Sequence, residues 1–88
     1  MSLDGRSILV TGAGRGLGLA LARRLGEDGA TLWLADIRVD WGEAAAESLR
    51  ADGVKAQFVR VDLRDAESVD AMAATVTSGG PLYGLVNN

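Results

Sequence analysis

The sequence predicts an α/β domain, built as a doubly wound parallel sheet of four strands in the order 3-2-1-4. Apolar runs of strand length alternate with segments of helical periodicity, which gives the element order β-α-β-α-β-α-β. Each connection is long enough to contain a helix, as parallel strands with right-handed crossovers require. A glycine-rich turn follows the first strand, at the point where such a sheet reverses its strand order.

The strands are predicted at residues 6–11, 30–36, 54–61 and 82–88. The first two are almost continuous apolar runs, which is typical of parallel strands covered on both faces. The first helix has leucines at 17, 21 and 25 on one face and ends near Asp28-Gly29.

The second and third helices have clear boundary signals. Asp40 with Glu43 resembles a capping box, and Asp52-Gly53 ends that helix. Asp65 is the expected cap of the third helix. Its buried stripe is predicted to contain Val69, Met72, Ala73 and Val76, and the break comes at residues 78–81.

The turn itself contains four glycines in seven residues, Gly12 to Gly18. Glycine is favoured where the backbone must adopt angles that a β-carbon obstructs, and where a phosphate approaches the main chain closely. Free amides at the helix start, together with the positive end of the helix dipole, predict a site for the pyrophosphate of a dinucleotide.

Asp36 strengthens this interpretation because it ends the second strand, 20 residues after Gly16. A carboxylate at that place accepts hydrogen bonds from both hydroxyls of an adenosine ribose. Asp62 ends the third strand in the same way and is a candidate to hold the adenine amine, with a loop acid or helix cap as the alternative. Arg15 either contacts a phosphate or is a surface arginine without a ligand. Trp33 and Trp41 are predicted to pack in apolar faces.

Composition excludes several other classes of function. The chain has 88 residues, no cysteine and no histidine, so neither a disulfide framework nor an ordinary zinc site is expected, and no metal site is predicted. A net charge of −3 without a basic cluster argues against nucleic acid or an anionic membrane as a partner. No apolar run approaches the length of a membrane span, and the start lacks a secretory signal, so a cytoplasmic location is expected.

Two ligand classes fit these residues, NAD and S-adenosylmethionine. Methyltransferases that use the latter also pair a Gly-x-Gly-x-Gly turn, here Gly12, Gly14 and Gly16, with an acid after the second strand. They usually place a further acid two positions before the first glycine, where this sequence has Val10.

At this point the sequence resembles a known family. Thr11-Gly12-x-x-x-Gly16-x-Gly18 is similar to the TGxxxGxG fingerprint of classical short-chain dehydrogenases/reductases, and Leu85-Val86-Asn87-Asn88 resembles the start of their NNAG motif. Asp62-Leu63 also matches in place. The resemblance covers nearly the whole chain and implies a Rossmann-like fold, with residues 1–88 as the N-terminal dinucleotide-binding part of one domain, truncated within the NNAG-like motif.

The resemblance implies an NAD-dependent oxidoreductase that interconverts a secondary alcohol and a ketone. It also implies a cofactor site around the pyrophosphate, the adenosine ribose and the adenine edge, composed of Gly12, Arg15, Gly16, Leu17, Gly18, Asp36, Ile37, Asp62, Leu63 and Asn88. NADP is less favoured, because its 2′-phosphate would lie against the charge of Asp36, although Arg15 and Arg38 moderate that preference.

No catalytic residue of the family is expected in this chain. The serine and the Tyr-x-x-x-Lys pair of the family lie further downstream, and Tyr83 is followed by Gly84, Leu85, Val86 and Asn87. The 88 residues alone should therefore be inactive, and the fourth strand should present an open edge. A small-molecule alcohol or ketone as substrate and a homo-oligomer are implied for the complete protein. The alternatives are a nucleotide-binding or interaction module that was never catalytic, and a methyltransferase fragment.

Overall fold

The computed structural model describes residues 2–88 and contains the predicted parallel sheet. Its strands are β1 (Ser7–Thr11), β2 (Thr31–Asp36), β3 (Ala56–Arg60) and β4 (Gly84–Val86). They lie side by side in the predicted order β3-β2-β1-β4, and every pair is parallel. In the register, Val10 of β1 lies between Leu34 of β2 and Val86 of β4. All four carboxyl ends therefore meet at one edge of the sheet.

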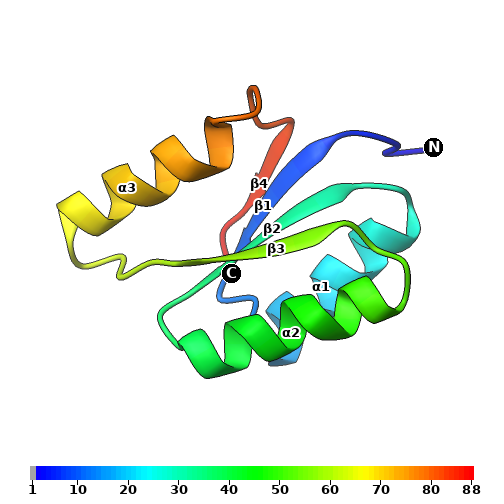
Figure 1. Ribbon diagram of the computed structural model, residues 1–88, viewed down its shortest axis with the longest axis horizontal. Helices are drawn as coiled ribbons and strands as arrows, with labels where there is room; N and C mark the ends of the chain where they lie inside the picture. The colour runs from blue at the N-terminus through cyan, green and yellow to red at the C-terminus, as the bar shows by residue number, and fades with distance from the viewer. Residues whose placement is uncertain (1) are drawn as a thin grey trace.

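Helices cover both faces of this sheet (Figure 1). The helices α1 (Gly16–Glu27) and α2 (Val39–Ala51) lie on one face, and α3 (Ala66–Thr77) lies on the other. This is the doubly wound arrangement that the alternation of strands and helices predicts. Within residues 2–88, no helix is both long enough and apolar enough to cross a membrane.

The sheet separates two apolar clusters. The larger lies against α1 and α2, and its fully buried members include Val10, Leu32, Leu34 and Leu49. The smaller lies against α3 and contains Leu9, Ala35, Val61, Met72 and Val76. Trp33 is partly buried against this second cluster, which confirms its predicted packing role. Because residues alternate between the two faces of a strand, neighbours such as Leu9 and Val10 belong to different clusters.

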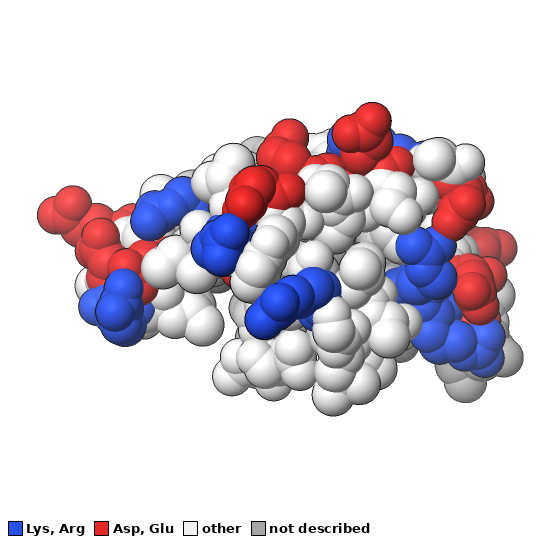
Figure 2. Space-filling model, turned by 90° about the horizontal axis from the view of Figure 1, so that it is seen from below, with Lys and Arg blue, Asp and Glu red and all other residues white. Residues whose placement is uncertain are grey.

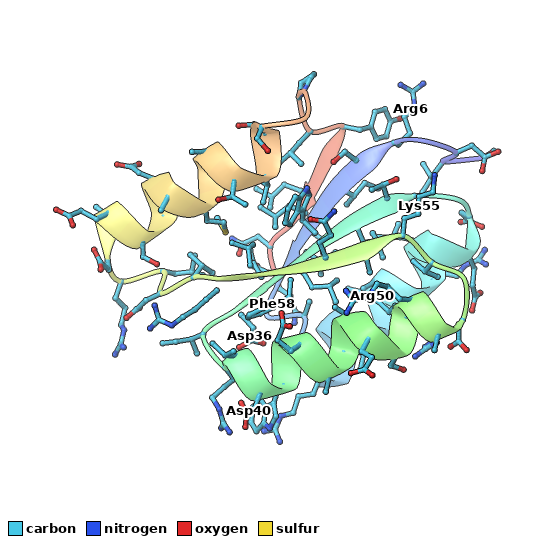
Figure 3. The ribbon with its side chains drawn as sticks, in the orientation of Figure 1. Arg6, Asp36, Asp40, Arg50, Lys55 and Phe58 are labelled. Carbon is cyan, nitrogen blue, oxygen red and sulfur yellow. The ribbon has the colours of Figure 1, made fainter. Side chains whose placement is uncertain are left out.

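Close approach of α2 to the sheet depends on a glycine. Phe58 of β3 reaches toward α2, as Figure 3 shows, and its ring occupies the space that a side chain at Gly42 would need. A β-carbon built on Gly42 would lie 2.0 Å from the Cε1 atom of Phe58. The Phe58 ring therefore packs directly on the backbone of α2 at Gly42.

The predicted leucine face of α1 is wrong in part. Leu17 is 66% exposed, whereas Gly18 and Ala22 face the sheet and are buried. Leu25 does pack against the core. Small residues form the buried face because they let the helix axis approach the sheet closely, and spacing alone does not distinguish that face from a neighbouring one.

Three other local predictions need correction. The Asp40–Glu43 capping box is wrong, because α2 begins at Val39 with Arg38 as the N-cap residue. The predicted buried stripe of α3 is wrong at Ala73, which is exposed, whereas Met72 and Val76 are buried. The fourth strand is shorter than residues 82–88, because the Asn88 amide leaves the sheet ladder and donates to the Thr11 hydroxyl. The predicted Asp65 cap is confirmed, since its carboxylate accepts from the Glu67 amide at 3.0 Å.

The glycine under the Phe58 ring has a measurable effect on stability. We expect Gly42→Ala to lower the free energy of unfolding by about 1–3 kcal/mol, because the clash with the ring exceeds the gain in helix propensity of about 1 kcal/mol. Denaturant unfolding measures this difference. Gly79→Ala is the matched control, since a β-carbon there would meet nothing within 4 Å. Adding Phe58→Leu should recover part of the loss, and a fully additive double variant would contradict the clash.

Candidate functional site

The glycine turn between β1 and α1 has the backbone that its sequence predicts. Gly12 has φ of 61° and Gly16 has φ of 62°, values that residues with a β-carbon rarely adopt. A β-carbon on Gly18 would lie 2.2 Å from the carbonyl oxygen of Gly12. Because Gly18 has none, the first turn of α1 packs directly on the glycine turn.

The N-terminus of α1 is open to an anion. Arg15 is its N-cap residue, yet its side chain makes no cap hydrogen bond within the described chain. The first turn also carries no acidic residue among these described positions. The backbone amides at a helix start have no partner inside the helix, and the helix dipole adds positive potential there. A phosphate group suits this place better than a side-chain carboxylate would.

Asp36 joins the end of β2 to the glycine turn. Its Oδ2 atom accepts a hydrogen bond from the Gly14 amide at 2.9 Å, and its Oδ1 atom accepts one from the Arg38 amide at 3.0 Å. A carboxylate has about four acceptor positions, so two remain for a ligand. The carboxylate is therefore held in a defined orientation and can still accept hydrogen bonds from a pair of hydroxyl groups.

Asp62 occupies the corresponding place at the end of β3. Its Oδ1 atom accepts from the Arg64 amide and from Nε of Arg64, both at 3.0 Å, and its Oδ2 atom accepts from Nη2 at 3.2 Å. The side-chain hydrogen bonds from Arg64 lower the pKa of the Asp62 carboxyl most, and the bond from the Arg64 amide lowers it further. Together they hold this pKa below its usual range. Ser68 fixes the backbone here, since its hydroxyl accepts from the Asp62 amide at 2.9 Å.

Thr11 connects the last residues of the chain to the turn. Its buried hydroxyl donates to the side-chain oxygen of Asn87 at 3.1 Å and accepts from the Asn88 amide at 3.1 Å. The Asn88 side chain in turn donates to the Gly12 carbonyl at 3.3 Å. Asn88 therefore lies against the glycine turn, although 76 residues separate the two in sequence.

A pocket of about 260 Å³ lies among these groups at the carboxyl ends of β1, β2 and β3. Its lining includes six of the predicted site residues, namely Gly12, Asp36, Ile37, Asp62, Leu63 and Asn88. The other four line the glycine turn and the start of α1 instead, namely Arg15, Gly16, Leu17 and Gly18. Ile37 and Leu63 are 43% and 58% exposed, so their apolar surfaces are open to a flat ligand. The two groups adjoin at Gly12, as a ligand with a pyrophosphate and an attached nucleoside would require.

A cluster of charged and aromatic side chains borders the site beside Asp36. The guanidinium of Arg15 lies over the Trp41 ring at 4.0 Å from its centroid, and that of Arg38 at 3.9 Å. Arg38 also donates from Nε and Nη2 to the two carboxylate oxygens of Asp40, at 3.2 and 2.8 Å. The predicted role of Trp41 in an apolar face is therefore wrong, because the ring supports two arginines at the rim.

The bonds within this cluster also affect titration. The side-chain hydrogen bonds from Arg38 hold the pKa of the Asp40 carboxyl below its usual range. Asp40 is therefore fully ionised at neutral pH and remains paired with the arginine.

Four residues of the site are not among the cofactor-binding residues predicted from sequence. Thr11, Val61 and Arg64 line the pocket, and the Gly14 amide orients Asp36. The Asp-x-Arg spacing of residues 62 and 64 is a signal for Arg64, since the two-residue offset lets the guanidinium turn back onto the acid. The signal for Thr11 is its place at the start of the TGxxxGxG fingerprint, although its hydrogen-bond partners are distant in sequence.

A larger cavity, of about 670 Å³, lies at the opposite end of the strands and includes Arg6, Thr31 and Tyr83 in its lining. Arg6 lies over the Tyr83 ring at 4.6 Å, at the upper right of Figure 3. None of the predicted site residues lines this cavity. In open α/β sheets, ligands bind outside the carboxyl ends of the strands, so the smaller pocket is the stronger candidate.

The charges on the helical face do not favour a polyanionic partner. Figure 2 shows acidic and basic side chains interspersed over the face that carries α1 and α2. Across the described residues, no group of three or more acidic side chains has the arrangement of a metal site.

The chain has clear relatives among known proteins. The sequence profile of the short chain dehydrogenase family matches residues 6–88. The chain is 38% identical over 86 residues to 2,5-dichloro-2,5-cyclohexadiene-1,4-diol dehydrogenase from Sphingobium indicum. That alignment covers 97% of this chain and 34% of the relative, so the chain spans about a third of the length of this curated protein.

Solved structures agree with the fold. L-Sorbose reductase from Gluconobacter frateurii, complexed with NADPH and L-sorbose, matches with a TM-score of 0.94 and 38% identity, over 100% of this chain and 34% of the other. A short chain dehydrogenase/reductase from Burkholderia phymatum in complex with NAD matches with a TM-score of 0.90 and 31% identity, over 97% and 31%. With the TGxxxGxG turn, the strand order and the family profile in agreement, this chain belongs to the short-chain dehydrogenase/reductase family of oxidoreductases.

Proposed function

We propose that the complete protein is an NAD-dependent oxidoreductase that interconverts a secondary alcohol and a ketone. In this proposal the 88 residues supply the half of the cofactor site that holds the pyrophosphate and the adenosine. The bound nicotinamide cofactor supplies the hydride donor or acceptor. The residues of this chain bind and orient the cofactor, and they take no part in moving a proton on the substrate.

The position and the hydrogen bonding of Asp36 are the main support for this proposal. Its carboxylate is fixed by the Gly14 amide and retains acceptor positions toward the pocket. Two hydroxyl groups on neighbouring carbons of a ribose match a carboxylate in this setting. The same carboxylate lies next to the glycine turn, so one ligand can place a ribose on Asp36 and its phosphates on the amides of α1.

The remaining roles follow the order of groups along such a ligand. Gly12, Arg15, Gly16, Leu17 and Gly18 surround the pyrophosphate at the turn. Ile37 and Leu63 lie on the flat faces of the adenine, since both expose apolar surface beside the pocket. Asp62 accepts from the adenine amine through an acceptor position that Arg64 leaves free. Asn88 contacts the adenosine ribose.

Charge favours NAD over NADP in this proposal. A 2′-phosphate would lie against the Asp36 carboxylate, and two like charges in a cleft repel each other by about one to several kcal/mol. The related structures include two with NADPH and one with NAD, so family membership leaves the choice to local residues. Asp36 is the local residue that opposes the 2′-phosphate.

Substrate chemistry requires residues beyond this chain. A general acid or base of the Tyr-x-x-x-Lys type does not occur in the 88 residues, because Tyr83 is the only tyrosine and it lacks a lysine at the fourth position after it. The diol dehydrogenase and sorbose reductase among the relatives act on alcohols and ketones, which supports the same substrate class for this protein.

Ligand choice is the first test of the proposal. We expect calorimetric titration to give the tightest binding for NAD, weaker binding for NADP, and no binding for S-adenosylmethionine, because the TGxxxGxG turn and the acid after β2 suit a dinucleotide. Thermal unfolding with each ligand checks the order independently. A preference for S-adenosylmethionine would contradict the proposed function.

Asp36 itself provides the second test. We expect Asp36→Asn to weaken NAD binding by about tenfold, because a neutral amide keeps one acceptor but loses the charge-assisted hydrogen bonds to the ribose. NADP binding should become tighter in the same variant, since the repulsion of the 2′-phosphate is removed. Glu47→Gln removes the same charge from an exposed position of α2 and should leave both affinities unchanged. Equal effects of the two variants would show that Asp36 acts only through net charge.

A further inference from the structure

The charged cluster beside Asp36 does not follow from the family motifs, and its geometry bears on the choice between NAD and NADP. Arg38 is engaged on two sides. Two of its five N–H donors bond to the carboxylate of Asp40, and its guanidinium lies over the Trp41 ring. An arginine held in this way has its planar donor group already matched by a carboxylate.

This cluster borders the carboxylate that the ribose would contact. The Arg38 amide donates to Asp36 at 3.0 Å. A β-carbon on Gly14 would lie 2.8 Å from the Oδ2 atom of Asp36 and 3.0 Å from Cβ of Trp41, so both side chains lie against the same residue of the turn. Figure 3 shows Asp36 and Asp40 at the same end of α2, where that helix begins.

The charges around this point balance. Asp36 and Asp40 carry two negative charges, and Arg15 and Arg38 carry two positive charges. A 2′-phosphate adds negative charge to the ribose, and a nearby arginine is the group that accommodates it in sites specific for NADP. Arg38 could accommodate a 2′-phosphate, but its guanidinium is already paired with the Asp40 carboxylate.

We propose that Asp40 is a positioning residue that favours NAD, because it holds the Arg38 guanidinium on the Trp41 ring and away from a 2′-phosphate. This inference rests on the proposed function, since it assumes that a nicotinamide dinucleotide binds beside Asp36. It differs from the role of Asp36, which repels the phosphate directly. Asp40 acts through Arg38 and contacts neither the phosphate nor the ribose.

The pair is suited to a test by mutation. The side chains of Arg38 and Asp40 are 48% and 65% exposed, and an exposed ion pair contributes little to folding stability. Asp40→Asn keeps the size of the side chain while removing its charge. The variant should therefore fold, and thermal unfolding without ligand checks that it does.

The experiment compares dissociation constants for NAD and NADP by calorimetric titration. We expect Asp40→Asn to tighten NADP binding by about three- to tenfold, as one unpaired charge near the phosphate implies, and to leave NAD binding within about twofold. The gain should shrink in high salt, because the contact is exposed to solvent. Glu47→Gln is the matched control, since it lies two turns further along the same face of α2, about 10 Å away.

The double variant tests the route through Arg38. In an Arg38→Gln background, Asp40→Asn should leave the ratio of the two dissociation constants within about twofold, because no arginine is released. A gain that persists in this background would overturn the inference, since it would arise from charge acting at a distance. An unchanged ratio in Asp40→Asn, with NAD binding intact, would overturn the inference alone. Failure of the unmodified protein to bind either nucleotide would overturn the proposed function and this inference together.

Discussion

The contact between Gly18 of α1 and the Gly12 carbonyl is the constraint on which the site depends. A β-carbon at residue 18 would lie 2.2 Å from that oxygen, so any other residue there would force the turn and the helix apart. Because the helix can rest on the turn, its first amides point to the same place as the end of β1. The glycine turn also places the Gly14 amide within hydrogen-bond distance of Asp36. One close backbone contact therefore aligns the first amides of α1 with the Asp36 carboxylate.

Electrostatics then divide the pocket into two parts. At the start of α1 there is positive potential from the helix and no nearby acid in its first turn, within the described chain. At the ends of β2 and β3 there are two carboxylates. Asp36 is oriented by two backbone amides, and Asp62 by the amide and the side chain of Arg64. A ligand with an anionic centre and a hydroxyl-bearing end fits this pattern, and a uniformly anionic polymer does not. The positive potential at the start of α1 is therefore local, in a protein with a net charge of −3.

Four of the exposed large apolar residues lie in two separate places. Leu63 and Ile37 lie at the pocket, whereas Leu85 lies on β4 at the end of the sheet order and Tyr83 lies beside it. The relatives extend over about three times the length that this chain covers. The pocket and the exposed surface of β4 are therefore separate features of the sheet.

The order of elements was determined by local signals in the sequence, because apolar runs, glycine positions and the Asp65 cap depend on neighbouring residues. The same signals identified Asp36 and Asp62, since each ends a strand. Only the tertiary structure decided which face of α1 is buried, because Leu17 and Gly18 are adjacent and packing depth selects the smaller residue. It also decided that Arg15 lies over the Trp41 ring, because that contact joins the glycine turn to α2. The pairing of Arg38 with Asp40 is local, since the two residues are only two positions apart. Periodicity describes a segment by itself, whereas the site forms where four segments meet.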